Sequence, residues 1–218
     1  MTSAERLQKL RGLYGIVDDG LEMAPFLWAR ALADGGASVI QLRFKRTPMG
    51  EALDQARRIR RELPGILLLI NDRVDLALLC AADGLHLGEH DLPVEEARRL
   101  LGADRLIGAT VRSVAEGEAR LAEGADHLGA GPVFASLTKS IAAPLLGLEG
   151  LRKICRALPG KPVVAISGID DENIGSVAAA GAHAAAVIGA IGRAADPLGA
   201  AKRLSRSFAL AAPKAERQ

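Results

Sequence analysis

The chain has 218 residues, carries a formal net charge of +2 and contains only 3% aromatic residues. This length suits one large α/β domain, which can run to ~250 residues, and the small charge and few aromatic rings argue against a nucleic-acid surface. No apolar run approaches the ~18 residues that span a membrane, and the N-terminal segment is polar and helix-prone, without the apolar core of a signal peptide.

Short apolar runs alternate with segments of helical periodicity along the chain. In chain order, we predict strands at residues 13–17, 37–42, 66–70, 84–87, 105–109, 127–130, 163–166 and 184–188. We predict helices at residues 23–33, 49–62, 74–81, 94–101, 114–123, 148–158, 172–180 and 197–207. Three turns from a helix into a strand contain a glycine, Gly36, Gly124 and Gly181, which suits a left-handed residue at the end of a helix.

This alternation predicts the fold class. Eight strand–helix units in ~220 residues fit a single closed (β/α)8 TIM barrel of the α/β class. We expect one domain over residues 1–218, with its core at about 12–208 and a flexible tail at 211–218. An open doubly wound sheet is the alternative, although no G-x-G-x-x-G motif follows the first strand.

The second strand ends in three polar residues at alternate positions. Gln41, Arg43 and Lys45 point to one side of an extended chain, so Ile40 and Leu42 must face the helices. Polar groups on the inward face of an apolar strand are costly unless they meet a partner or a ligand. We therefore expect a ligand site here, with pairing of Arg43 to a carboxylate at the barrel rim as the structural alternative.

Two aspartates follow the next two strands. Asn71 and Asp72 end the third apolar run, and Asp91 lies shortly after the fourth. Asn71 and Asp72 could instead form an Asx turn or cap a helix, and Asp91 could instead cap a helix. Mg²⁺ binds one or two carboxylates and completes its shell with phosphate oxygens and water. Beside Arg43 and Lys45, the pair Asp72 and Asp91 predicts Mg²⁺ as the cofactor of a polyphosphate site.

Phosphate chemistry is also indicated after strands six, seven and eight. The loop that contains Ser136, Thr138 and Lys139 is long enough to act as a lid, and Lys139 is a candidate phosphate cation or, alternatively, a solvated lysine. Glycine-rich turns follow the last two strands, at the usual phosphate site of a barrel. Their candidate substrate-binding residues are Ser167, Gly168, Ile188 and Gly189.

The histidines and cysteines suggest no catalytic set. His86 suits a core position on the fourth strand, and His90, His127 and His183 share no metal-ligand spacing. No Ser-His-Asp order, C-x-x-C or H-E-x-x-H motif occurs. Two cysteines, Cys80 and Cys155, lie far apart in apolar stretches, so we expect reduced thiols and a cytoplasmic protein.

Over about residues 12–195 the chain resembles the thiamine-phosphate synthase family. The matching stretches are QLRFK (41–45), INDRVDLAL (70–78), DGLHLGEHDLP (83–93), GPVFASLTK (131–139), GLEGL (147–151) and AISGI (165–169). The resemblance implies a (β/α)8 barrel that acts as a transferase. It would couple 4-amino-2-methyl-5-(diphosphomethyl)pyrimidine with a 4-methyl-5-(2-phosphoethyl)thiazole, giving thiamine phosphate and pyrophosphate. In the family, pyrophosphate leaves first and the thiazole nitrogen captures a stabilised pyrimidine cation.

The resemblance also implies roles for individual residues. The residues that match the family's pyrimidine-diphosphate contacts are Gln41, Arg43, Lys45, Asn71 and Lys139. Asp72 and Asp91 match its Mg²⁺ ligands, and Ser136 and Thr138 match hydroxyls near the thiazole and the reacting centre. The thiazole-phosphate loops are matched at Gly168 and Gly189. Of these, we expect Arg43, Lys45 and Lys139, together with Thr110, to take part in catalysis. No nucleophile or general base is required, because a metal and cations can stabilise the departing trianion electrostatically.

Five residues depart from the family's pattern. Glu89 replaces the usual Gln, Thr110 a Ser and Ser136 a Thr, and these three keep polarity and reach. Glu89 adds a charge near the leaving group. Ser167 replaces a Gly and Gly189 a Ser, which puts the contacts to the thiazole phosphate in question.

Two other functions are compatible with this fold. The related thiazole tautomerases commonly lack the metal aspartates and use a histidine where this chain has Arg112. A catalytically silent phosphate-binding barrel is the second alternative, against which the intact Asp72, Asp91 and Lys139 argue. We expect small-molecule substrates, with neither nucleic acid nor a membrane as partner; a homo-oligomer is compatible with the sequence.

Overall fold

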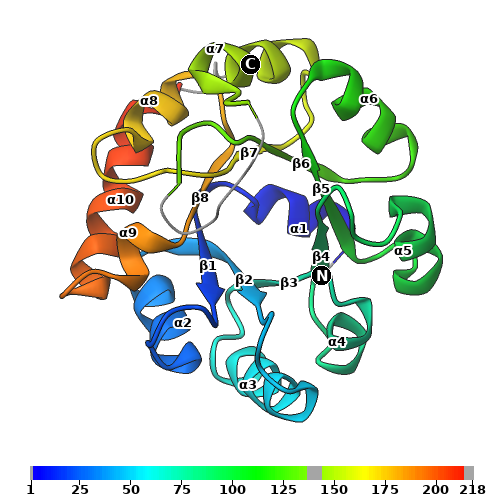
Figure 1. The fold of residues 1–218 in the computed structure, drawn as a ribbon, viewed down its shortest axis with the longest axis vertical. Coiled ribbons are helices and arrows are strands. Elements are labelled where there is room, and N and C mark those ends of the chain that lie inside the picture. The colour runs from blue at the N-terminus through cyan, green and yellow to red at the C-terminus, as the bar shows by residue number, and fades with distance from the viewer. Residues whose placement is uncertain (1, 137–143, 214–218) are drawn as a thin grey trace.

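Eight parallel strands pair in chain order and close into a barrel between β8 and β1 (Figure 1). The computed structural model describes residues 2–136 and 144–213. The strands are β1 (Gly12–Asp18), β2 (Ala37–Arg43), β3 (Leu67–Asn71), β4 (Gly84–Leu87), β5 (Leu106–Val111), β6 (His127–Ala130), β7 (Val163–Ala165) and β8 (Ala184–Val187). The expected TIM barrel is thus confirmed, and the open sheet is wrong.

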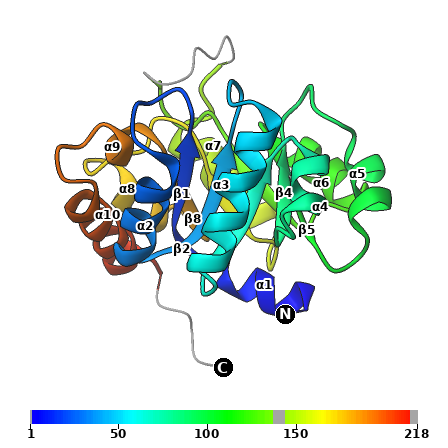
Figure 2. The same ribbon diagram turned by 90° about the horizontal axis from the view of Figure 1, so that it is seen from below.

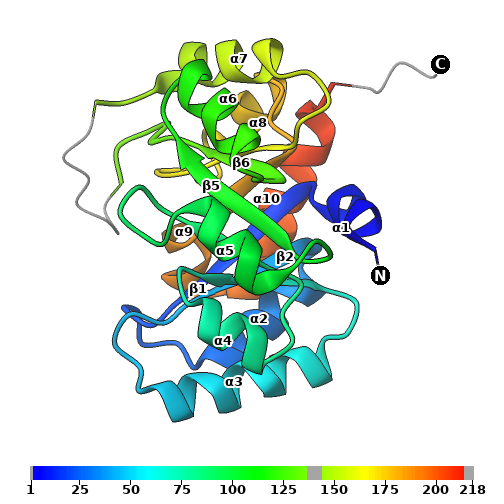
Figure 3. The ribbon, with the colours of Figure 1, turned by 90° about the vertical axis from the view of Figure 1, so that its right-hand side faces the viewer.

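The helices form an outer ring around these strands. They are α2 (Pro25–Asp34), α3 (Met49–Glu62), α4 (Val74–Leu79), α5 (Val94–Leu101), α6 (Val114–Ala122), α7 (Gly147–Ala157), α8 (Ile174–Ala179) and α10 (Pro197–Ala211), with a four-residue helix, α9 (Gly189–Gly192), after β8. An N-terminal helix, α1 (Ser3–Lys9), lies across one end of the barrel, as Figures 2 and 3 show. No helix in the described part of the chain is long and apolar enough to cross a membrane.

Two apolar clusters follow from the two-residue period of the strands. Ile40 and Leu42 belong to the larger cluster, between the barrel and the helices, as their alternation with Gln41 predicts. The smaller cluster fills the barrel interior on the side of α1 with Tyr14 and aliphatic side chains. Leu10, which directly follows α1, packs into it. The barrel is therefore closed at the α1 end, and its polar inward positions lie toward the other end.

A buried ion-pair cluster attaches α1 to the barrel. Asp83, which has no exposed surface, accepts hydrogen bonds from Arg6, from Arg60 and from the backbone N–H of Leu68. These bonds outweigh the cost of burial and lower the pKa of the Asp83 carboxyl. The cluster stabilises the closed end of the barrel and leaves the other end to the functional residues.

The helix boundaries differ from the predicted ones for local reasons. The helix expected at 23–33 begins at Pro25, whose fixed φ suits the first helical turn. The helix expected at 74–81 ends at Leu79, because Ala81 has a φ of +52°. The helix expected at 172–180 begins only at Ile174, since Asp170 Oδ1 first accepts the backbone N–H groups of two following residues in a turn.

Other boundaries move outward. The helix expected at 197–207 continues to Ala211 because Phe208, one turn farther on, is buried. The strand expected at 105–109 runs from Leu106 to Val111, in register with β6. The predicted glycine caps are confirmed, with φ values of +93°, +104° and +99° at Gly36, Gly124 and Gly181.

Candidate active site

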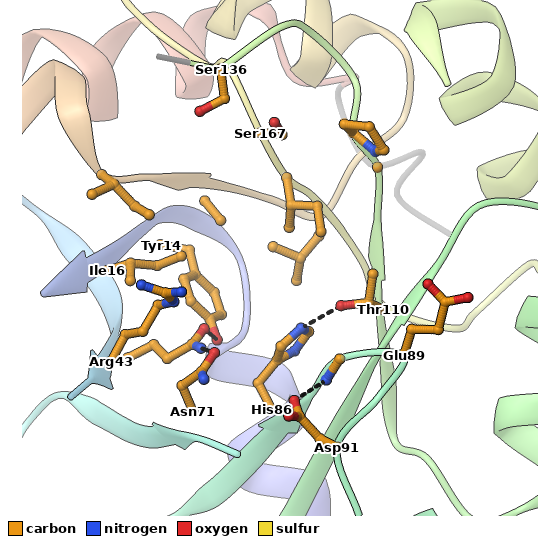
Figure 4. Close-up of a pocket in the computed structure, with 18 of the residues that line it drawn as sticks. Tyr14, Ile16, Arg43, Asn71, His86, Glu89, Asp91, Thr110, Ser136 and Ser167 are labelled. Carbon is orange, nitrogen blue, oxygen red and sulfur yellow. Dashed lines mark hydrogen bonds between the residues drawn. The ribbon is translucent and has the colours of Figure 1, made fainter. Parts of the chain in front are cut away.

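A cavity of about 450 Å³ opens at the carboxyl ends of the strands. Loop and strand-end residues from around the barrel line it, among them Tyr14, Gln41, Arg43, Lys45, Asn71, His86, Glu89, Asp91, Thr110, Arg112, His127, Ser136, Ser167 and Ile188. Figure 4 shows Arg43, Tyr14 and Asn71 on one side of this cavity and Ser136 and Ser167 on another. The closed barrel therefore gathers residues that lie far apart in the sequence.

A continuous chain of hydrogen bonds runs up one wall of the cavity. The buried phenol of Tyr14 donates to Gln41 Oε1 at 2.8 Å, and Gln41 Nε2 donates to Asn71 Oδ1 at 2.9 Å. Asn71 Nδ2 then donates to Asp72 Oδ2 at 2.9 Å, and Lys45 Nζ pairs with the same carboxylate oxygen. Every polar group in this row has a partner, as buried polar groups require.

Arg43 pairs with a carboxylate at the barrel rim, which is the structural alternative that the sequence left open. Its Nη1 lies 2.5 Å from Oδ2 of Asp18, a residue only 6% exposed at the end of β1. Arg43 nevertheless lines the cavity. The pair holds the guanidinium at the mouth, where its remaining donors can meet an anion.

The two predicted metal ligands follow neighbouring strands. Asp72 lies at the end of β3 and its backbone N–H donates to the His86 carbonyl of β4 at 2.9 Å. Its φ of +53° is rare outside glycine, although aspartate tolerates it better than most residues. Asp72 does not itself line the cavity, but its contacts Lys45 and Asn71 do.

Neither aspartate caps a helix. Asp91 Oδ2 accepts the backbone N–H of Gly88 at 2.7 Å, whereas α5 begins after Pro93 without a side-chain cap. α4 likewise begins after Arg73 without one. The capping interpretation of both residues is therefore wrong.

The donor set fits Mg²⁺. Lys45 and Asn71 contact Oδ2 of Asp72, so its Oδ1 is not used by either. No cluster of three or more His, Cys, Asp or Glu side chains suited to a metal occurs in the described ranges. Two carboxylates near the side chains of Arg43 and Lys45 suit Mg²⁺, which takes one or two carboxylates and keeps water and other oxygens as its remaining ligands.

Two histidines that the sequence left without a function also line the cavity. His86 Nε2 and Thr110 Oγ1 are 3.1 Å apart. The His127 ring, with its centroid 6.1 Å from that of His86, is fully buried, and neither of its nitrogens has a hydrogen-bond partner among the described residues. Burial lowers the pKa of His127 to about 3, so this ring is neutral. A Cβ added at Gly108 would lie 2.2 Å from His127 Nε2 and 2.7 Å from His86 Nδ1, so glycine makes room for both rings.

Glu89 does not bring an uncompensated charge to the mouth. Arg112 Nη1 lies 2.7 Å from Glu89 Oε2, and this pairing lowers the pKa of the Glu89 carboxyl. The two residues follow β4 and β5, which are neighbours in the barrel. The charge introduced by one departure from the family pattern is thus balanced by Arg112.

A second cavity, of about 330 Å³, adjoins the first along Ser136, Ser167 and Ile188. Gly168 and Gly189 line it, as does Arg193, an exposed cation just after α9. It has the components of the usual barrel phosphate site, namely the loops after β7 and β8 and a short extra helix.

Backbone geometry explains the two residues after β7. Gly168 has a φ of +67°, and a Cβ there would approach the Ala135 carbonyl oxygen to 2.3 Å. Ser167 has a φ of +77°, a conformation that favours glycine, and its hydroxyl donates to the Phe134 carbonyl at 3.2 Å. This serine does not cap a helix, because α8 begins only after Asn173.

The structure brings together most of the residues predicted from the sequence. Thr138 and Lys139 lie outside the described residues. Sequence reasoning missed Tyr14, His127 and Arg193, and gave Arg112 no partner. Tyr14 and His127 could have been found as polar residues at inward positions of β1 and β6, and Arg112 as an opposite charge to Glu89 on an adjacent loop.

Comparisons with known proteins agree with this geometry. A family model described as thiamine monophosphate synthase matches residues 13–191. A thiamine-phosphate synthase of Anaeromyxobacter dehalogenans is 52% identical, covering 94% of this chain and 91% of the relative. One of Myxococcus xanthus is 48% identical, covering 95% and 97%. The solved structure of a thiamine phosphate pyrophosphorylase from Pyrococcus furiosus superposes with a TM-score of 0.85 at 37% identity, covering 94% of this chain and 98% of that one.

Proposed function

The chain belongs to the thiamine-phosphate synthase family, and we propose which of its residues perform each part of the reaction. The enzyme is a transferase of thiamine biosynthesis that forms thiamine phosphate, and the tautomerase and silent-barrel alternatives are not supported. In the coupling, the bond from the pyrimidine's methylene carbon to the diphosphate oxygen breaks and pyrophosphate departs with its electron pair. The thiazole nitrogen then forms the new bond to that carbon.

The leaving-group end is the side of the first cavity that is lined by Arg43 and Lys45, with Asp72 and Asp91 as the metal ligands. Lys139, which lies outside the described residues, is assigned to the same leaving group on the family motif alone. Asp72 and Asp91 would hold Mg²⁺, which would neutralise negative charge on the departing pyrophosphate. Lys45 pairs with Asp72, so its ammonium group would lie beside a diphosphate held by these residues. This convergence of a cation, an amide and a carboxylate at the end of β3 is the observation that carries the proposal.

The ring of the pyrimidine substrate is assigned to the deeper part of the first cavity. Gln41 and Asn71 offer amide groups there, and Thr110 offers a hydroxyl beside His86. Aliphatic side chains such as Ile166 complete the lining. Such a mixture suits a flat heterocycle with a few polar edge groups.

The thiazole phosphate is assigned to the second cavity. Its phosphate would meet the backbone N–H groups near Gly168 and Gly189, with Ile188 beside the ring and Ser136 and Thr138 near the reacting centre. Ser167 and Gly189 have exchanged the family's usual glycine and serine on two loops of this one cavity. We infer that the Ser167 hydroxyl, which donates to the Phe134 carbonyl in this structure, turns to donate to the bound phosphate and supplies the contact that Gly189 lacks.

Product formation tests this function directly. The purified protein, incubated with the pyrimidine diphosphate and the thiazole phosphate, should give thiamine phosphate and pyrophosphate only when Mg²⁺ is present. A chelator should stop the reaction, and added Mg²⁺ should restore it. Product at an undiminished rate in the presence of chelator would contradict the metal assignment, and no product from folded protein would contradict the assigned activity.

We also propose where the protein is located and how it is assembled. Cys80 and Cys155 are free thiols, which supports a reducing, cytoplasmic location. The substrates proposed are the two small molecules alone, and a homo-oligomer is compatible with this function.

A further inference from the structure

The second cavity has an unusual distribution of charge. Arg193, which directly follows the short helix α9, is the only lysine or arginine among the described residues that line it, and Asp170 is their only carboxylate. The other lining residues are glycines, serines, alanines and isoleucines. One arginine and one aspartate therefore determine the charge of this cavity wall.

Arg193 differs from the cations of the first cavity in having no carboxylate partner. The lysine and arginine side chains that line the first cavity each form an ion pair, and they are Arg43, Lys45 and Arg112. Within the described part of the chain Arg193 pairs with no carboxylate, although Asp170 lines the same cavity. An arginine carries several N–H donors and keeps its charge in proteins. The charge and the donors of Arg193 are therefore available to a bound anion.

The ligand assigned to this cavity carries a charge that the backbone cannot balance. A phosphate monoester bears about −1.5 to −2 charges at pH 7. The backbone N–H groups near Gly168 and Gly189 can donate hydrogen bonds but carry no net charge, and the carboxylate of Asp170 would repel the phosphate. A guanidinium can donate to two phosphate oxygens at once through parallel N–H groups. Arg193 therefore offers the positive charge that the rest of the described lining lacks.

We propose that Arg193 binds the phosphate of the thiazole substrate and determines the preference for the phosphorylated thiazole over its free alcohol. The proposal rests on the function assigned above, in which the thiazole phosphate occupies the second cavity. The free alcohol ends in a neutral hydroxyl, so the guanidinium gains little from it. Specificity is a difference between two affinities, and here Arg193 adds binding free energy for the phosphate alone.

The test is the Arg193→Gln variant, which removes the charge and keeps a polar side chain. Because the Arg193 side chain is exposed, the variant should fold normally. Equilibrium affinities are measured for the thiazole phosphate, the free thiazole alcohol and the pyrimidine diphosphate. We expect the affinity for the thiazole phosphate to fall about tenfold, the effect of one hydrogen bond to a charged group at a solvent-exposed site. The affinities for the free alcohol and the pyrimidine diphosphate should stay the same.

Arg203→Gln is the matched control, because it removes one positive charge from an exposed side chain of α10 that pairs with Asp171 and does not line the cavity. A loss of affinity confined to the thiazole phosphate and to Arg193→Gln would support the proposal. An unchanged affinity for the thiazole phosphate in Arg193→Gln would overturn it.

The proposal would also be overturned by an equal loss in Arg203→Gln, since general surface charge would then attract the phosphate. A parallel loss for the free alcohol or the pyrimidine diphosphate would overturn it as well, because Arg193 would then support the site only as a whole. If the unaltered enzyme forms no thiamine phosphate, the proposed function itself fails. A normal rate in the unaltered enzyme, with an unchanged preference in Arg193→Gln, contradicts only the role of Arg193.

Discussion

His127 should make the protein lose stability in acid. Its ring is fully buried, its two nitrogens have no partner among the described residues, and burial lowers its pKa from 6.5 to about 3. The unfolded chain exposes the same ring with an ordinary pKa near 6.5. Between pH 6.5 and 3, the unfolded state therefore binds a proton that the folded state does not bind, and the free energy of unfolding falls as the pH falls.

The size of the effect follows from the distance between the two pKa values. Each pH unit between them is worth about 1.4 kcal/mol, so His127 should cost about 3 kcal/mol of stability at pH 4.5 and up to about 5 kcal/mol near pH 3. A loss of 3 kcal/mol is a large part of the total stability of a domain. Burial also lowers the pKa of His183, but that contribution is common to the variants compared below.

Urea unfolding at pH 7 and pH 4.5 measures this contribution. His127→Leu removes the titrating group, and we expect it to lose about 3 kcal/mol less between the two pH values than the unaltered protein. His90→Leu is the matched control, because the His90 side chain is 90% exposed, and it should follow the unaltered protein. Equal losses in His127→Leu and the unaltered protein would refute the assignment of a neutral, buried His127.

Three further predictions concern the metal site, the phosphate loops and the closed end of the barrel. Asp72→Asn and Asp91→Asn should each lower the rate at least a hundredfold while changing stability by less than about 1 kcal/mol, since neither caps a helix; near-normal rates would contradict the ligand assignment. Ser167→Gly should weaken thiazole-phosphate binding about tenfold with little change in unfolding free energy, because glycine suits the φ of +77°, and adding Gly189→Ser should restore most of the affinity in a titration. Asp83→Asn should lower the free energy of unfolding by about 3 kcal/mol in urea and leave KM unchanged, since Asp83 is buried against two arginines far from the cavity; a raised KM with normal stability would contradict its structural role.

The sequence was sufficient for features that depend on local pattern. The two-residue period places Gln41 and Arg43 on the inward face of β2, and the eightfold alternation predicts the barrel. Family motifs located the glycine-containing loops after β7 and β8 and the two aspartates. Helix ends were less accurate, because they depend on individual backbone angles such as that of Ala81, and α9 is too short to show a helical period.

Contacts between distant segments could not be read in the same way. Tyr14 and Gln41 are 27 residues apart, and only the pairing of β1 with β2 brings the phenol to the amide. Glu89 looked like an added charge because its partner, Arg112, lies on the loop of the next strand. The histidine pair depends on Gly108, whose missing side chain makes room for two rings from the strands on either side.

The hydrogen-bonded row that begins at Tyr14 and the buried ring of His127 differ in how fully their polar atoms are paired. On the Tyr14 side, every amide and carboxylate is paired before any substrate binds, so little reorganisation is needed when charge moves to the leaving group. On the His127 side, two buried nitrogens have no hydrogen-bond partner among the residues that the structure describes, and each such group costs stability. Hydrogen bonds fix the orientation of the Gln41 and Asn71 amides on one wall, next to the proposed leaving-group site. The buried His127 ring therefore lowers the free energy of unfolding in acid. Urea unfolding of the His127→Leu variant measures this loss of stability separately from catalysis.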